Sequence, residues 1–256
     1  MTAGTAKSGP GALHIGTSGW AYRGWKEHLY KGVPQRCWLV RYAEVFRAVE
    51  VNATFYRLMK PETLARWHDE TPDDFVFTAK GHRVVTHTRK LRDVGDAIRR
   101  SRDNMGPLAG KLRVVLWQLP AKLVKDLDVL KAFGADIREW PTVRHVLEFR
   151  DDTWFDDEVR AVLDEAGLGT CVSDSPRWPR WDATTAGIGY ARLHGHERLY
   201  ASCYGAEGLR HWTMVVRGWL DAGLDVHVYF DNDAEGFAPS DAQCLATMLG
   251  EDGKAA

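Results

Sequence analysis

The sequence predicts a single TIM-type (β/α)8 barrel, and three observations lead to this fold class. Eight short runs rich in Val, Ile, Leu or Phe are bounded by Gly, Pro or Asp, as expected for strands. Segments with helical spacing of apolar residues separate most of these runs, and such alternation produces a parallel sheet. The length of 256 residues also suits one barrel domain.

The expected strands are short and mostly continuous in their apolar character. That pattern is typical of parallel strands that are buried on both faces. In chain order the expected strands are Leu13–Thr17, Ala48–Asn52, Phe75–Lys80, Arg113–Leu119, Val143–Phe149, Gly169–Ser173, Gly189–His194 and Val226–Asp231.

Helical patterns occupy the segments between these strands. Pro61 opens one helix at a first-turn position, and Gly167 and Gly223 follow two others where a C-cap glycine belongs. The expected helices are Cys37–Arg47, Pro61–Glu70, Val94–Arg102, Lys122–Phe133, Phe155–Ala166, Glu207–Ala222 and Pro239–Leu249.

One strand–helix unit is expected to be irregular. Between the sixth and seventh strands the chain contains Pro176 and Pro179 together with Trp178 and Trp181. Because proline removes a backbone donor and clashes within a helix, a loop over Pro176–Asp182 is expected to replace the helix after strand six.

A doubly wound open sheet is the alternative fold. Such sheets often carry a G-x-G-x-x-G fingerprint after the first strand, whereas this chain has Gly16-Thr-Ser-Gly-Trp there. The barrel is therefore favoured, as one domain over residues 13–250. Residues 1–12 are expected to form a disordered tail and residues 251–256 a flexible one.

Composition limits the functional class. The net charge of −1 gives no global field for nucleic acid, and no apolar run approaches the roughly 18 residues of a membrane span. Four scattered cysteines lack zinc spacing and suit a reducing compartment. We therefore expect a cytoplasmic protein with no membrane partner, while its oligomeric state stays open.

Polar and aromatic residues gather where the strands end, which is the functional face of such a barrel. Several are two positions apart, as in Glu50 and Asn52, and so share one face. The candidate catalytic residues are Glu50, His82, Glu148, Asp174 and His194. The candidate substrate-binding residues are Trp20, Tyr22, Asn52, Tyr56, Lys80, Gln118, Arg150, Trp154, Arg192 and Asn232.

Charges at these positions are costly unless they are paired or bind a ligand. We expect an anion such as phosphate to bind between Lys80, Arg150 and Arg192, since Arg and Lys recognise such groups. The alternative is a structural layer of ion pairs in which Glu50 and Glu148 neutralise these cations. The aromatic residues either stack on a sugar or nucleobase, or pack beneath the loops.

No metal or other cofactor is expected. Glu50, Glu148, Asp174, His194 and Asp231 could converge as oxygen and nitrogen ligands. However, the sequence has no H-x-H or H-E-x-x-H spacing, and the neighbouring cations would repel a metal ion.

The strand-end segments resemble the YecE-like family, domain of unknown function 72. They are Gly16-Thr-Ser-Gly-Trp-Ala-Tyr, Val49-Glu-Val-Asn-Ala-Thr-Phe-Tyr, Phe77-Thr-Ala-Lys-Gly-His, Trp117-Gln-Leu-Pro, Leu147-Glu-Phe-Arg, Arg192-Leu-His-Gly and Val228-Tyr-Phe-Asp-Asn-Asp. The resemblance covers roughly residues 13 to 249. It implies a TIM-type barrel and no established activity.

Two functions from different classes follow from the strand-end residues. The first is an enzyme, a hydrolase or lyase, that acts on an anionic small molecule or nucleotide-like substrate by Glu and His acid–base chemistry. The second is a non-catalytic protein that binds nucleic acid or a partner through the same basic, aromatic mouth. Glycoside hydrolysis is less favoured, because a cation near each Glu would lower the pKa of the required acid.

Overall fold

The computed structural model describes residues 11–250, and its strands close a parallel barrel in chain order. The predicted barrel is thereby confirmed. The strands are β1 Leu13–Ser18, β2 Ala48–Val51, β3 Val76–Lys80, β4 Leu112–Gln118, β5 Arg144–Glu148, β6 Leu168–Asp174, β7 Ile188–Leu193 and β8 Asp225–Phe230.

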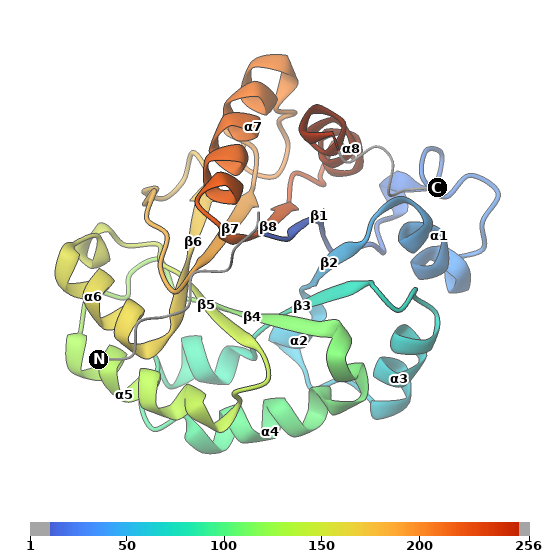
Figure 1. The fold of residues 1–256 in the computed structure, drawn as a ribbon. Coiled ribbons are helices and arrows are strands. Elements are labelled where there is room, and N and C mark those ends of the chain that lie inside the picture. Colours follow the sequence, from blue (N-terminus) through green and yellow to red (C-terminus); the bar gives the residue numbers. More distant parts are fainter. Residues whose placement is uncertain (1–10, 251–256) are drawn as a thin grey trace.

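Helices surround the strands on the outside of the barrel (Figure 1). They are α1 Trp38–Val45, α2 Ala53–Tyr56, α3 Pro61–Asp69, α4 Gly95–Met105, α5 Leu127–Asp136, α6 Asp157–Ala166, α7 Gly205–Asp221 and α8 Ala238–Leu249. A single π-helical turn, η3, covers Val84–Thr88 after β3. No helix in the described part of the chain is both long and apolar enough to cross a bilayer.

Capping residues set two helix starts later than the sequence pattern suggested. Asp126 accepts a hydrogen bond from Val129 N at 3.1 Å, so α5 begins at Leu127 and not at Lys122. Asp156 caps α6 in the same way. A carboxylate that satisfies a free N–H of the first turn fixes where a helix begins.

The segment between β6 and β7 has no helix, as predicted. Instead Trp181 stacks on Phe155, with ring centroids 5.3 Å apart, and packs edge-on against Phe149 at 5.9 Å. These rings supply apolar contacts where a helix would otherwise lie against the sheet. The loop thereby stays folded without regular structure.

The predicted tails lie mostly outside the described residues. Only positions 11 and 12 of the N-terminal tail are described, and they are ordered against the barrel. Ala12 O accepts a hydrogen bond from Val226 N at 2.7 Å, which extends the pairing of β1 with β8. The backbone pairing with β8 therefore includes the residue before Leu13.

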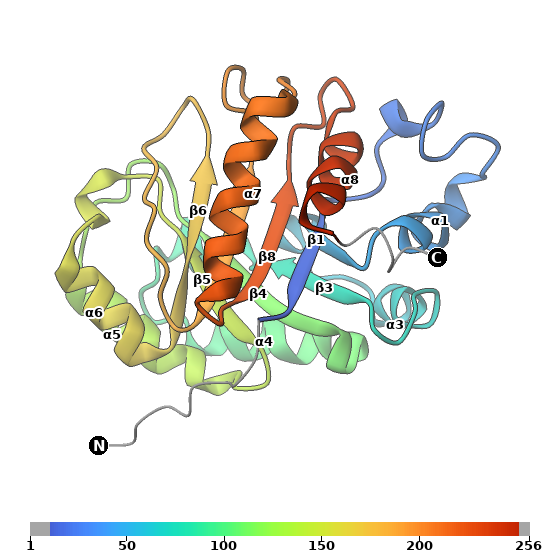
Figure 2. The ribbon, with the colours of Figure 1, turned by 45° about the horizontal axis from the view of Figure 1, so that its top comes forward.

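The barrel interior is layered along the strand direction. Its apolar side chains form a cluster separate from the core beneath the helices, consisting of Ala48, Val76, Val114, Leu116, Val146, Cys171, Ile188, Tyr190 and Tyr229. Two residues further along several of these strands the inward positions become polar, as at Glu50 and Glu148. β6 and β8 point toward the same end of the barrel (Figure 2), so the parallel strands carry this polar layer together.

Gly81 allows the end of β3 to lie against β4. Its N–H donates to Leu116 O at 2.8 Å, and a Cβ added at Gly81 would lie 2.2 Å from the Trp117 ring. We predict that Gly81→Ala lowers the free energy of unfolding by about 1–3 kcal/mol, because the ring cannot move aside in a packed interior. Chemical denaturation measures this loss.

Gly106→Ala is the matched control. Gly106 has helical backbone angles and open space around the added methyl group, so the substitution is expected to be neutral or slightly stabilising. Equal losses in both variants would contradict the packing argument.

Candidate functional site

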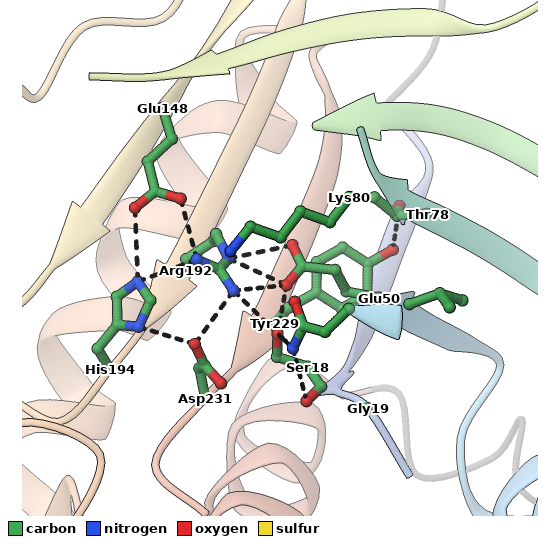
Figure 3. Close-up of polar contacts among 12 residues, drawn as sticks. Ser18, Gly19, Glu50, Thr78, Lys80, Glu148, Arg192, His194, Tyr229 and Asp231 are labelled. Atoms are coloured by element: carbon green, nitrogen blue, oxygen red, sulfur yellow. Dashed lines mark hydrogen bonds and ion pairs between the residues drawn. The ribbon is translucent and has the colours of Figure 1, made fainter. Parts of the chain in front are cut away.

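The centre of the strand-end layer is the guanidinium of Arg192, which is only 1% exposed. Its nitrogens form ion pairs with Glu50 at 2.8 Å, Glu148 at 2.9 Å and Asp231 at 3.1 Å. Nη2 also donates to Ser18 Oγ at 3.0 Å. Figure 3 shows Arg192 between carboxylates that come from β2, β5 and the end of β8.

This arrangement changes the role expected for Arg192. Every side of its guanidinium already faces an acceptor of the protein, so it has no free donor for an external anion. Three carboxylates, including Asp231, balance the cations Arg192, Arg150 and Lys80. The ion-pair alternative therefore describes the buried part of this layer.

Glu50 and Glu148 are fully buried and held by hydroxyl groups as well as by arginine. Glu50 accepts hydrogen bonds from Ser18 Oγ and from Tyr190 Oη, the latter at 2.6 Å. Glu148 accepts from Ser173 Oγ at 3.2 Å. Burial alone would raise the pKa of Glu148, but Arg150 and Arg192 outweigh it and lower that pKa. Glu148 therefore stays ionised.

His194 lies beside this cluster and is also fully buried. Its Nδ1 is 2.9 Å from Asp231 Oδ2, and its Nε2 is 3.8 Å from Glu148 Oε1. Burial and the charge of Arg192 lower the pKa of His194. Although burial opposes it, Arg192 also lowers the pKa of Asp231. A neutral imidazole beside an ionised carboxylate is the state these neighbours favour.

A cavity of about 770 Å³ opens above the buried cluster. Many of the predicted binding residues line it: Tyr22, Asn52, Tyr56, Lys80, Gln118, Arg150 and Arg192. Glu50, Glu148 and His194 lie behind them in the cluster that contacts Arg192. The alternation of side chains along the strands thus brings these ten candidates to one region.

Lys80 enters this cavity from the end of β3. Its Nζ lies 4.6 Å from the centroid of the Phe55 ring. Within residues 11–250 its ammonium forms no ion pair and no hydrogen bond. Burial, assisted by the charge of Arg192, lowers the pKa of Lys80 to about 8, although Glu148 and Glu50 oppose the shift. A fraction of this amine is therefore neutral near pH 7.

Asp233 is a second ionisable group that lines this cavity, and its carboxyl oxygens are buried. Neither carboxyl oxygen has a hydrogen-bond partner within the described residues, and the nearby Tyr22 hydroxyl donates to Ser18 O at 2.6 Å. Burial and the negative charge of Asp231 raise the pKa of Asp233 well above its usual range, although the Tyr22 hydroxyl and the charge of Arg192 oppose the shift. Asp233 therefore favours the protonated, neutral form.

Two predicted site residues face away from the cavity. Asp174 Oδ2 accepts from Trp212 Nε1 of α7 at 3.3 Å, while its neighbour Ser173 faces the barrel centre. Asn232 donates to Asp241 at 2.7 Å and to Ser202 O at 3.0 Å. Side chains alternate between the two faces, so the residues next to Asp174 and Asn232 point inward in their place. The expected inward-facing position was therefore one residue off in both segments.

Three further candidates do not line the cavity. β3 ends at Lys80, and His82 Nδ1 accepts from Val84 N at 3.3 Å instead. Trp20 packs edge-on against Trp67 of α3. Trp154 is buried and donates to the carbonyl of Leu123 at 2.6 Å.

Trp178 packs against the candidate site and not into open space. Its ring lies 3.8 Å from Arg150 Cζ, and its Nε1 donates to Ser173 Oγ at 2.8 Å. It also contacts His194 edge-on, with centroids 5.1 Å apart. The irregular loop thus covers one side of the site.

The cavity is also lined by residues that were not among the candidate catalytic or substrate-binding residues, although Asp231 had been considered as a metal ligand. They are Phe55, His87, Pro120, Ala121, Tyr200, Asp231, Asp233 and Ala234. A two-residue alternation from Tyr229 could have indicated Asp231 and Asp233. By contrast, His87 reaches the cavity through the π-helical turn η3, for which the sequence has no simple signature. Residues 11–250 contain no group of three or more His, Cys, Asp or Glu placed to hold a metal ion.

We predict that Arg192→Met lowers the free energy of unfolding at pH 7 by about 3–5 kcal/mol, because it leaves buried carboxylates without their main counter-charge. Arg92→Met is the control, since the exposed pair of Arg92 with Asp126 should contribute little to stability. Urea denaturation of both variants measures the difference. Similar losses would show that Arg192 does not hold the site together.

Lys80→Met is expected to stabilise the protein at pH 7 by about 1–3 kcal/mol, since it removes a partly buried cation that has no ion-pair partner. Between about pH 8 and the unfolded value of 10.5, the unfolded wild-type chain binds more protons than the folded one. Wild-type stability therefore rises with pH in that window, and the advantage of Lys80→Met shrinks. Denaturation at pH 7 and pH 9.5 tests this, and a constant difference would contradict it.

Known proteins resemble this chain over most of its length. YecE from Escherichia coli K12 is 33% identical over 136 residues, which cover 53% of this chain and only 43% of that relative. YunF from Bacillus subtilis is 24% identical over 93% of this chain and 94% of its own length.

A solved DUF72 family protein from Thermotoga maritima has the same fold. It superposes with a TM-score of 0.85 at 25% identity and covers 93% of this chain and 99% of its own. The family model described as "Protein of unknown function DUF72" matches residues 14–256. The chain belongs to the DUF72 family, as its strand-end segments predicted.

Proposed function

We propose that this protein is an enzyme that acts on a small anionic molecule in the strand-end cavity by general acid–base chemistry. Asp233 serves as the proton donor and Lys80 as the base. One observation carries the proposal: the half-buried ammonium of Lys80 and the buried carboxyl group of Asp233 line the same cavity, and neither makes a hydrogen bond or ion pair within the described residues.

Ionisable groups without polar partners lower the stability of the folded protein, so their presence in one cavity points to a function. A carboxyl or ammonium group that is removed from water without a hydrogen-bond partner loses hydration and gains no compensating interaction. Catalytic sites often contain groups whose pKa values are displaced in this way, toward the pH at which they exchange protons. Here the displacement favours a neutral acid and a partly neutral amine, which are the forms required of a donor and an acceptor.

Arg150 is the residue best placed to bind the anionic part of the substrate. Its Nε and Nη2 contact Glu148 Oε1, each at 2.8 Å, while Nη1 makes no hydrogen bond within residues 11–250. The guanidinium lines the cavity and is fixed against Trp178. A preoriented arginine with a free donor suits phosphate or carboxylate.

Glu50 and Glu148 take a different role from the one expected. They serve as counter-ions that orient Arg192 and Arg150, because arginine and hydroxyl donors occupy their oxygens. Binding of nucleic acid is less supported, since Trp178 and Trp154 pack within the protein and the exposed rings left at the cavity are two tyrosines, Tyr56 and Tyr200.

Inorganic phosphate tests the anion site. We expect phosphate to raise the thermal stability of the wild type, by about 2.7 kcal/mol at a hundredfold excess over its Kd. Arg150→Met should lose this effect. Arg177→Met, an exposed arginine of the neighbouring loop, should retain it. Equal stabilisation of all three proteins, or of none, would place no anion at Arg150.

Asp233→Asn separates catalysis from binding. In an NMR screen of small phosphorylated and carboxylated compounds, the wild type should convert at least one compound that phosphate displaces. Asp233→Asn should still bind phosphate but lose the conversion. A compound that binds at Arg150 and is never converted would favour a binding protein instead.

A further inference from the structure

The backbone around Lys80 is fixed while its side-chain tip is left free. Thr54 Oγ1 donates to Lys80 O at 2.7 Å, and the next residue, Gly81, is paired with β4. The side chain then extends toward Arg192 (Figure 3). The ammonium lies over the Phe55 ring and not against a carboxylate. Lys80 is therefore held in position without its nitrogen being occupied.

Lys111 is a buried lysine of this chain whose ammonium has hydrogen-bond acceptors. Lys111 is 6% exposed, and its Nζ donates to the carbonyls of His68 at 2.6 Å and Thr71 at 2.8 Å. Lys80 has no such acceptors among the described residues. A lysine that lines a cavity and whose nitrogen makes no hydrogen bond to the protein can contact a ligand, whereas Lys111 serves only to satisfy backbone carbonyls.

The charged groups around Lys80 favour a reactive amine. Burial and the charges of Arg192 and Arg150 oppose protonation of Lys80. Glu148 and Glu50 favour protonation, but their carboxylates are paired with these arginines. His87 also lines the cavity, and burial together with Lys80 lowers the pKa of its imidazole. The neutral amine is the form that attacks a carbonyl carbon.

We infer that Lys80 is a nucleophile that forms an imine with a small aldehyde or ketone carrying a carboxylate or phosphate group. The inference rests on the proposed function, since Arg150 would bind the anionic group and Asp233 would supply the proton. In this inference Lys80 forms a covalent bond to the substrate instead of acting only as a base.

Imine formation can be completed with the side chains of Lys80 and Asp233, which both line the cavity. The lone pair of the Lys80 amine forms a bond to the carbonyl carbon, and one N–H proton moves to the carbonyl oxygen to give a carbinolamine. Asp233 then protonates the hydroxyl group, which leaves as water while the nitrogen lone pair forms the C=N bond. The products are a protonated imine, water and the Asp233 carboxylate, and hydrolysis reverses each change without a redox partner.

Reductive trapping tests this inference. The protein is incubated at pH 7 with glyoxylate, pyruvate or dihydroxyacetone phosphate, and sodium borohydride then reduces any imine to a stable secondary amine. We expect one adduct per chain, found by intact mass, and a missed tryptic cleavage after Lys80. Labelling of Lys80 should exceed that of exposed lysines by at least about tenfold, because more of its amine is neutral.

Two variants serve as controls. Lys80→Arg should lose the adduct while keeping its fold by circular dichroism. Lys122→Arg, which removes an exposed lysine outside the cavity, should label as the wild type does. Adducts spread over the lysines, or retained in Lys80→Arg, would overturn the inference.

The phosphate experiment separates the two proposals. If none of the three carbonyl compounds labels Lys80 in protein that phosphate stabilises through Arg150, the imine inference fails and the proposed function stands. If phosphate stabilisation through Arg150 is absent as well, both fail.

Discussion

The buried guanidinium of Arg192 is the interaction on which the strand-end layer depends. Glu50, Glu148 and Asp231 come from strands on different sides of the barrel and would repel one another in a dry interior. One planar cation with donors on every side holds all three. Arg192 thus fixes the relative positions of β2, β5, β7 and β8 at the end where the cavity opens.

The same cluster sets the protonation of the groups above it. Arg192 is one cause of the lowered pKa of Lys80, and the ionised Asp231 is one cause of the raised pKa of Asp233. Because burial acts in the same direction for both, the two effects add. A structural ion-pair layer and a reactive cavity are therefore parts of one arrangement.

The irregular loop after β6 completes this arrangement. A helix there would run along the outside of the barrel, whereas the loop places Trp178 against Arg150 and His194. Trp181 meanwhile packs with Phe149 and Phe155 and holds the loop to the body. Of the tryptophans that suggested a stacking surface for a ligand, Trp178 instead supports a charged side chain, and Trp154 packs beneath the loops.

The sequence by itself determined the barrel, the order of its strands and the missing helix after β6. It also indicated most of the ionisable side chains at the strand ends. Glu50 with Asn52, and Glu148 with Arg150, were recognisable because two-residue spacing keeps both side chains on one face. Where a strand is apolar on both faces, only the tertiary structure decided which face points into the barrel. A shift of one residue replaces Asp174 by Ser173 and Asn232 by Asp231 and Asp233. The pairing of Arg192 was also beyond the sequence, because it depends on side chains from strands far apart in the chain that meet only when the barrel closes.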